Sequence, residues 1–560
     1  MHLALTDVRR LTGPNLLWDN PGAIIDVEVE GPLDGALASW QKWSRTLLDE
    51  FGWNDEQQNF RLFDGGASFA ISAPIDALYT ACDLTELMWQ CCCADLTHSA
   101  MPDWPSRLGS LALQRAEEAN PALIALVSAA RQHHVTCLTD DDEVSLGMGP
   151  SVDVWPVTQL PNPGAIVWSK YHDIPSALIT GTNGKSTSVR LAARIAKAAQ
   201  FTAGVTSTDS IRVGDDILDE GDYSGPGGAR MLLRDPRTEM AFLEVARGGI
   251  LRRGLPVVAV NAALITNVAS DHLGQYGINT VDELAQAKFV VTKALHGDAV
   301  LVVNADNALV VQHARNSKHT LCWFSQDESN PLVQQQLSQG GRAVFVSDGT
   351  VTYCAQGQCE SIMAIDQIAM TFKGTAEHNI QNALGVVGLC KALNLPVTAI
   401  VQGLAEFGSD PQDNPGRGNR YQINGIEVIV DFAHNEHSMR AVVSMVKKIP
   451  AKRRFVMFSH AGDRSDREIK HLTAAVADLG AHAYLVTEVE KYLRGRNLGD
   501  ISVLAKQYLM ELGITAEQVC FAPDPLAGSK QAMEMAQPGD VVLLFVLDDR
   551  QQVHDWLSNL

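Results

Sequence analysis

The stretch Leu178-Ile179-Thr180-Gly181-Thr182-Asn183-Gly184-Lys185-Ser186-Thr187 decides the fold of this chain. A short apolar run enters a turn with two glycines, and an amphipathic pattern predicts a helix through 188–196. Glycines let backbone N–H groups approach phosphate oxygens, while the helix N-terminus and a lysine add positive charge. The spacing G-x-x-x-x-G-K-[ST] would require glycine at position 179, so this is a shorter variant, G-T-N-G-K-S. It predicts a nucleotide-phosphate loop; the alternative is a plain strand–helix turn with a surface lysine.

Strand and helix patterns alternate on both sides of this loop, which is typical of a parallel sheet covered by helices. The expected strands are 177–180, 240–245, 257–266, 299–304, 427–430, 454–459, 483–487 and 541–547, with hairpins within 318–373 and a helix at 379–393. A Pro- and Gly-rich linker is expected at 408–416. Residues 1–165 mix short strands with helices at 36–51, 75–94 and 121–133. We therefore predict an α/β chain with an α+β N-terminal domain (1–165), a central phosphate-binding domain (166–408) and a smaller C-terminal domain (409–560).

The composition is that of an ordinary globular protein, with 46% hydrophobic and 19% charged residues and a length that predicts about three domains. The net charge of −21 argues against nucleic acid and anionic membranes as partners, because like charges repel. The ten cysteines show no repeated C-x-x-C spacing, and residues 91–93 read as buried helix. No leader peptide or membrane-length apolar run is visible, so a reducing, cytoplasmic location is expected.

The phosphate loop resembles that of the Mur ligase family, whose members form amide bonds with ATP. Segments 222–230, 233–236, 243–252, 266–274, 462–464 and 493–496 are similar to the C-terminal half of cyanophycin synthetases. Gly13-Pro14-Asn15 is similar to the start of their N-terminal domain. The resemblance covers about 170–560. It implies Mur ligase architecture, with a P-loop parallel-sheet central domain, a Rossmann-like C-terminal domain and an α+β N-terminal domain.

Cyanophycin synthetases contain a large ATP-grasp domain, and this chain has no room for one. The spacer from Val144 to Pro175 is only 32 residues long, far shorter than a catalytic domain. One of that enzyme's two active sites is therefore expected to be missing. We expect a single amide-forming reaction rather than synthesis of a polymer backbone.

The resemblance implies ATP and Mg²⁺ as cofactors. It assigns ATP binding to Gly181, Thr182, Asn183, Gly184, Lys185, Ser186, Thr187, Asn379, Arg417 and Asp431. It assigns the metal to Ser186, Glu244, His272 and Lys288, the last only if carbamylated, because an unmodified lysine is a cation. The expected catalytic residues are Lys185, Glu244, His272, Lys288 and Arg417.

Each of these residues also has a structural interpretation. Glu244 is alternatively a helix cap or an ion-pair partner, His272 an ordinary packed histidine, and Lys288 an exposed helix lysine. Asn379 follows His378, and both fit a helix start, where Asn is a common cap. Arg417 and Asp431 could instead form ion pairs across a domain boundary.

The remaining candidates are substrate contacts: Ser224, Gly225, Gly227, Arg230, Arg247, His434, Asp463, Arg464, Arg494 and Arg496. Paired arginines can hold a carboxylate, and surface solvation is the alternative. The expected function is ATP-dependent coupling of a carboxylate to an amino-acid amine, on an aspartate-containing peptide or a cyanophycin-like substrate. The alternatives are a Mur-type ligase with another acceptor, such as a glutamate ligase, and a catalytically silent binding relative. The expected partners are amino-acid or peptide substrates, and homo-oligomerisation is left open.

Overall fold

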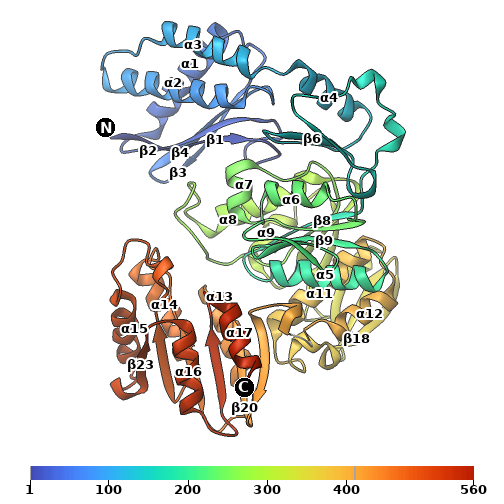
Figure 1. The fold of residues 1–560 in the computed structure, drawn as a ribbon, viewed down its shortest axis with the longest axis vertical. Helices are drawn as coiled ribbons and strands as arrows, with labels where there is room; N and C mark the ends of the chain where they lie inside the picture. Colours follow the sequence, from blue (N-terminus) through green and yellow to red (C-terminus); the bar gives the residue numbers. More distant parts are fainter. Residues whose placement is uncertain (1, 409–410) are drawn as a thin grey trace.

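The structure is a computed structural model that describes residues 2–408 and 411–560, and these residues form four sheets (Figure 1). An antiparallel sheet with the order β1-β2-β4-β3 opens the chain. Its strands are β1 (Leu3–Leu11), β2 (Gly22–Val29), β3 (Gln58–Phe63) and β4 (Gly66–Ser72). Helices α1 (Leu33–Glu50), α2 (Leu78–Thr97) and α3 (Trp104–Glu118) complete this N-terminal unit, and α3 was missed in the sequence.

The two central strands of the N-terminal sheet, β2 and β4, are buried along almost their whole length, whereas the edge strands β1 and β3 are partly exposed. Ile25 and Val27 of β2 face the core shared with α1 and α2, where Trp40 stacks on Phe69 with ring centroids 4.8 Å apart. Ile24 faces the opposite side. Residues 91–93 lie in α2, as predicted. Helix α4 (Pro121–Gln132) and a small sheet of β5 (Cys137–Thr139), β6 (Glu143–Leu146) and β7 (Asp153–Pro156) follow.

The central sheet has the order β11-β10-β9-β12-β8-β13-β14-β15-β16-β17-β18. The strands from β9 to β16 in this order are parallel, and antiparallel hairpins flank them at both edges. Their bounds are β8 (Ser176–Thr180), β9 (Ala203–Thr206), β10 (Ser210–Val213), β11 (Asp216–Glu220), β12 (Met240–Glu244), β13 (Val260–Ile265), β14 (Leu295–Asn304), β15 (Thr320–Ser325), β16 (Arg342–Ser347), β17 (Thr350–Ala355) and β18 (Gln358–Ala364). The segment 318–373, which we expected to form hairpins, thus also contains the parallel strand β15.

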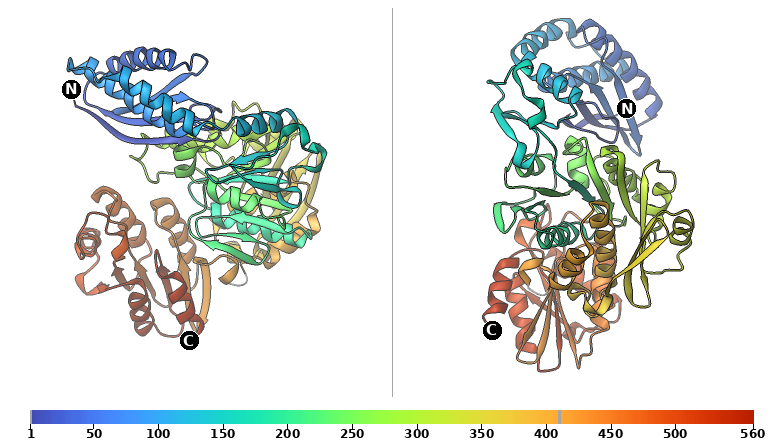
Figure 2. Two further views of the ribbon diagram at one scale, coloured as in Figure 1. Left: turned by 45° about the horizontal axis from the view of Figure 1, so that its top comes forward. Right: turned by 90° about the vertical axis from the view of Figure 1, so that its right-hand side faces the viewer.

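Helices cover both faces of this sheet, each over its own apolar core (Figure 2). One face carries α5 (Lys185–Ala198), α11 (Glu377–Ala392) and α12 (Val397–Glu406). The other carries α6 (Pro226–Leu233), α7 (Arg247–Arg253), α8 (Val281–Phe289), α9 (Ala308–Ala314) and α10 (Pro331–Ser338). Helix α8 ends at Phe289 and continues as a 3₁₀ turn, Val290–Ala294. Such a doubly covered parallel sheet places its ligands at the carboxyl ends of the strands.

A second, six-stranded sheet with the order β19-β20-β24-β21-β22-β23 forms the C-terminal unit. Its strands are β19 (Arg417–Ile423), β20 (Ile426–Asp431), β21 (Arg454–Phe458), β22 (Ala483–Thr487), β23 (Val519–Ala522) and β24 (Val541–Phe545). Helices α13 (Glu436–Lys447), α14 (Asp466–Ala477) and α15 (Asp500–Glu511) pack on one face, and α16 (Pro525–Met535) and α17 (Arg550–Ser558) on the other. Residues 409 and 410 of the expected linker lie outside the described residues, and Pro411–Asp413 form a 3₁₀ turn.

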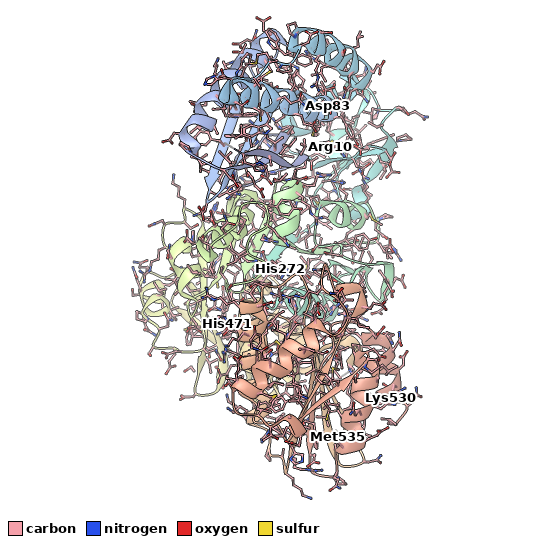
Figure 3. All side chains as sticks on the ribbon, turned by 90° about the vertical axis from the view of Figure 1, so that its left-hand side faces the viewer. Arg10, Asp83, His272, His471, Lys530 and Met535 are labelled. Carbon is pink, nitrogen blue, oxygen red and sulfur yellow. A yellow bond between two sulfur atoms is a disulfide. The ribbon has the colours of Figure 1, made fainter. Side chains whose placement is uncertain are left out.

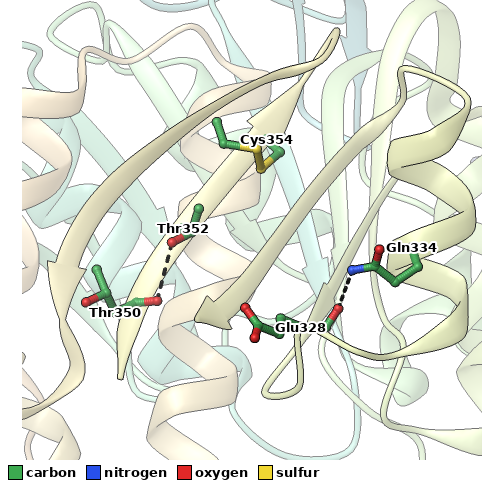
Figure 4. The surroundings of a disulfide bond; sticks show 6 residues. Glu328, Gln334, Thr350, Thr352 and Cys354 are labelled. Atoms are coloured by element: carbon green, nitrogen blue, oxygen red, sulfur yellow. Dashed lines mark hydrogen bonds between the residues drawn. A yellow bond between two sulfur atoms is a disulfide. The ribbon is translucent and has the colours of Figure 1, made fainter. Parts of the chain in front are cut away.

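The expectation of reduced cysteines needs one correction. Cys354 and Cys359 face each other in the β17–β18 hairpin and form a disulfide (Figure 4). The two residues are directly paired across the strands, where side chains on one face lie close together. The other eight cysteines are free. No helix among the described residues is long and apolar enough to cross a membrane.

Candidate active site

The phosphate loop joins β8 to α5 at the carboxyl edge of the central sheet, where a cleft of about 1340 Å³ lies between the central and C-terminal units. Two positions in the loop require glycine. Gly181 and Gly184 have φ angles of 149° and 88°, and a Cβ would lie 1.9 Å from the Thr266 hydroxyl oxygen or 2.1 Å from Asn382 Oδ1. The loop is therefore packed against two neighbouring elements with no room for a side chain.

Hydrogen bonds fix this loop to the segment after β13. Thr182 Oγ1 donates to the Ala269 carbonyl at 3.1 Å, and the Asn183 N–H donates to Asn267 Oδ1 at 3.0 Å. Lys185 Nζ donates to the Thr182 carbonyl at 3.0 Å and has no ion pair within the part of the chain that the structure describes. A fixed loop with an uncompensated lysine is ready to receive an anion.

Glu244 ends β12 beside this loop, and both of its carboxylate oxygens are buried without a hydrogen-bond partner. Burial raises the pKa of Glu244, and the nearby Lys185 opposes that shift. A buried, unpartnered carboxylate is costly unless a cation pairs with it. Glu244 together with the Ser186 hydroxyl, an oxygen donor at the start of α5, therefore fits a hard cation such as Mg²⁺.

Lys288 lies in α8 with only 4% of its surface exposed, so the alternative of an exposed helix lysine is wrong. Its Nζ donates to the Gly181 carbonyl of the phosphate loop at 2.8 Å. Burial and the nearby Lys185 lower the pKa of Lys288 well below the usual lysine range. The side chain is thus held against the loop in an environment that favours its neutral amine.

His272 lies where the central and C-terminal units meet (Figure 3). Ligand atoms of Asp271, His272 and His434 all lie within 4.8 Å of one another, and His434 comes from the C-terminal unit. His434 Nδ1 is 3.1 Å from the Phe432 carbonyl, and burial lowers the pKa of this imidazole to about 4. Arg464 Nη2 lies 3.6 Å from Asp271 Oδ1 on the other side of the cluster.

Two arginines from the C-terminal part of the chain reach the phosphate loop through Asp209. Arg550 Nη2 lies 2.8 Å from Asp209 Oδ1, while Arg417 Nη2 and Arg190 Nη2 lie 3.9 Å and 2.6 Å from its Oδ2. Burial would raise the pKa of Asp209, but the three guanidinium groups hold it well below the usual range. The guanidinium carbons of Arg417 and Arg550 also lie 4.5 and 4.7 Å from the centroid of the Phe432 ring. This is an ordered cationic group at the mouth of the phosphate loop.

Several sequence-predicted residues do not line the cleft. The Asn379 amide donates to the Met370 carbonyl at 2.8 Å, and the Ser224 hydroxyl donates to Asp222 at 2.6 Å. Arg230 faces Asp140 at 3.5 Å, and Arg496 donates to Asp466 at 2.7 Å. Gly225, Gly227 and Asp431 are also outside the lining, whereas the lining includes Arg247, His434, Asp463, Arg464 and Arg494.

Sequence reasoning missed two residues that line the cleft, Asp209 and Arg550, and a third that contacts the phosphate loop, Asn435. Asn435 Nδ2 donates to Asn183 Oδ1 at 2.9 Å, which ties the C-terminal unit to the phosphate loop. Asn435 directly follows His434, a substrate contact expected from the sequence, so this position was the available signal. Asp209 and Arg550 are 341 residues apart and carry no local pattern that would connect them.

Two family models match this chain. The Mur ligase middle domain matches residues 179–390, and the Mur ligase glutamate ligase domain matches residues 416–545. The chain belongs to the Mur ligase family.

Within that family, the chain is similar to cyanophycin synthetases. It is 32% identical over 371 residues to that of Trichormus variabilis, which covers 66% of this chain and 41% of that protein. It thus spans about two fifths of the length of these curated relatives. The UDP-N-acetylmuramoylalanine–D-glutamate ligase of Chromobacterium violaceum is 25% identical over 65% of this chain and 68% of that enzyme. The structure of E. coli FolC in complex with ADP, at 17% identity, has a TM-score of 0.51, covers 69% of this chain and 89% of that chain, and supports the fold alone.

Proposed function

We propose that the chain is an ATP-dependent ligase that activates a substrate carboxylate as an acyl phosphate and couples it to an amino-acid amine. The observation that carries the proposal is the phosphate loop with an unpaired Lys185 beside the buried, unpartnered Glu244. Family membership and the ligases among its relatives support the reaction type. A catalytically silent relative would not be expected to retain this costly carboxylate. We also propose functional domain boundaries near residues 165 and 408.

The chain's own groups account for the first chemical step. Lys185 and the loop amides would hold the β- and γ-phosphates, and Arg417 would approach the γ-phosphate from the C-terminal unit. The acceptor carboxylate oxygen attacks the γ-phosphorus, the bond to the β-phosphate oxygen breaks, and ADP leaves. The amine then attacks the acyl carbon, phosphate leaves, and the amine gives up a proton. Closure of two units over this cleft would exclude water from the reactive intermediate.

One Mg²⁺ would be held by Ser186 and Glu244 and a second by His272, with a carbamylated Lys288 as a further ligand. When bound, the metal neutralises phosphate charge that would repel an incoming carboxylate. Carbamylation requires a neutral amine: the Lys288 nitrogen attacks carbon dioxide, a C–N bond forms and one proton is released. The burial of Lys288 supports that state.

The experiment that tests the proposal measures ADP and phosphate release against a panel of acidic acceptors and the twenty amino acids. We expect release only when one acceptor–amine pair is present, because either substrate alone leaves the reaction incomplete. The preferred pair names the substrates and separates an aspartate-peptide ligase from a glutamate ligase. Absence of stimulation by any pair would favour the silent relative.

Asp431 gives the reaction an expected pH dependence. Burial raises its pKa to about 6, against the opposing charge of Arg417. Asp431 lies outside the cleft lining, but its carboxylate accepts the Ala433 N–H at 2.7 Å and attracts Arg417, which we place at the γ-phosphate. Ionised Asp431 should therefore position Arg417 for ATP, and kcat/KM for ATP should fall about tenfold between pH 7 and pH 5. The pKa of Asp431 is higher in the folded protein than in the unfolded chain. The free energy of unfolding should therefore fall as pH rises from about 4 to about 6, because the ionised carboxylate is disfavoured in its buried position.

The variant Asp431→Asn should lose both effects. We expect its kcat/KM for ATP to be low and independent of pH between about pH 5 and pH 7. Its free energy of unfolding should no longer fall between about pH 4 and pH 6. Initial rates and denaturant unfolding in matched buffers measure the two profiles. If kcat/KM of the variant still falls at acidic pH as in the parent protein, another group titrates.

A further inference from the structure

We propose that the N-terminal domain clamps the loop 270–280, which carries Asp271 and His272, and that Arg61 is a positioning residue for the ligase reaction. The inference rests on the proposed function for the role of His272. Residues 1–178 lie outside both family models, so nothing in those matches assigns this domain a task. The assignment comes from contacts between the central unit and the face of the N-terminal sheet that carries Arg9 and Arg61.

The first observation is the way Arg61 holds the loop backbone. From β3, its Nη2 donates to the Tyr276 carbonyl at 2.6 Å and its Nη1 donates to the Gly277 carbonyl at 2.7 Å. Glu283 Oε1 lies 3.7 Å from the same guanidinium group. A planar guanidinium with two parallel donors fixes two successive carbonyls in orientation as well as in position.

The second observation is that the loop adopts a conformation it would not hold unaided. His272, Gly274, Tyr276 and Gly277 all have positive φ angles, of 48°, 88°, 55° and 63°. Two of these residues are not glycine, and such backbone persists only where the surroundings determine it. The loop is therefore a segment whose shape depends on its external contacts.

The third observation is that further groups of the same domain close around the loop. The Arg9 guanidinium carbon lies 4.9 Å from the centroid of the Tyr276 ring, and Arg9 Nη1 is paired with Asp26 at 2.6 Å. Ser68 donates to Asp26 at 2.6 Å, which completes a buried network on the sheet. A Cβ on Gly277 would lie 2.3 Å from the ring of Phe63, so the loop fits closely against β3.

The loop is held from the catalytic side as well. Arg247 Nη1 donates to the His272 carbonyl at 2.8 Å, and its Nη2 donates to Gln275 Oε1 at 2.7 Å. Arg247 begins α7, and Arg9 Nε donates to the Leu251 carbonyl of that helix at 2.9 Å. The N-terminal sheet thus contacts both the loop and the helix that supports it. Loss of the Arg61 contact should loosen the loop and leave the phosphate loop unchanged.

The test compares Arg61→Met with Arg45→Met. Arg45 is a matched control because it also donates to backbone carbonyls, those of Trp53, Asn54 and Glu56, but only within the N-terminal domain. We expect Arg61→Met to lower amide-exchange protection over 271–278 by about tenfold, because two charged hydrogen bonds to the loop are lost. Protection over 185–198 should stay unchanged in both variants.

With substrates, Arg61→Met should lower kcat about tenfold and raise the Mg²⁺ concentration for half-maximal activity, while ATP binding stays within twofold. Arg61→Lys, which keeps a cationic donor, should recover part of both effects. Unchanged exchange over 271–278, or a kcat equal to that of Arg45→Met, would overturn the clamp. Exchange is measured without substrates, so a failure of the clamp is distinguishable from a failure of the proposed ligase function. If Arg61→Met unfolds, Gly277→Ala disturbs the same contact from the loop side and should give the same local exchange.

Discussion

Lys185→Ala is expected to lower kcat/KM for ligation by at least about 10³-fold, as does the loss of other cations that stabilise a transferring phosphoryl group. The ammonium lies in the phosphate loop with its Nζ on the Thr182 carbonyl and without an ion pair among the described residues. Its charge is therefore available to the phosphates, where negative charge develops during transfer. Initial rates of ADP release with the best acceptor–amine pair measure the effect.

The control for this prediction is Lys197→Ala on the same helix. Lys197 is exposed and pairs with Asp215 at 2.6 Å, a surface ion pair that contributes little to stability. We expect its kcat/KM within twofold of the parent protein. Comparable rates for Lys185→Ala and Lys197→Ala would contradict the phosphate-loop assignment.

Lys288→Ala is expected to lower kcat at least about 100-fold, an effect of the size seen when a group that supports a metal site is lost. The lysine is buried against the Gly181 carbonyl, so its removal takes away the proposed carbamate at the loop itself. Small carboxylates such as formate or acetate should restore part of the rate, because they can supply the missing anion in the space left by the side chain. The measurement is kcat against added carboxylate at constant ionic strength.

Lys293→Ala provides the matched control, since Lys293 lies in the following 3₁₀ turn and pairs with Asp19 at 3.0 Å on the surface. Neither rate loss nor carboxylate rescue is expected there. In the parent protein, ¹³C-labelled bicarbonate should give a carbamate signal that Lys288→Ala lacks. Full activity in Lys288→Ala would contradict a role for Lys288 at the metal site. So would a rate loss that no carboxylate restores, if the parent protein also gives no carbamate signal.

The sequence predicted the parts of this molecule that depend on neighbouring residues. The phosphate loop follows the buried strand β8 and Glu244 ends the buried strand β12, so hydrophobic pattern and strand position place both at the carboxyl edge of the sheet. The family resemblance, rather than periodicity, brought in His272, Lys288 and Arg417.

Contacts between distant parts of the chain could not be predicted in the same way. Asn183 and Asn435 are 252 residues apart, and Arg61 and Tyr276 are 215 apart. Their meeting depends on how three units pack, for which short-range patterns carry no information. Asn379 occupies a helix start as expected, but it turns its amide to the Met370 carbonyl, which is only nine residues away.

The central claim is that ATP activates a carboxylate as an acyl phosphate, and oxygen transfer tests it most directly. The acceptor identified by the substrate panel would be labelled with ¹⁸O in its carboxylate and incubated with enzyme, ATP and amine. Attack of that carboxylate on the γ-phosphorus predicts one ¹⁸O atom in each phosphate released. Release of phosphate without ¹⁸O during amide formation would contradict the account.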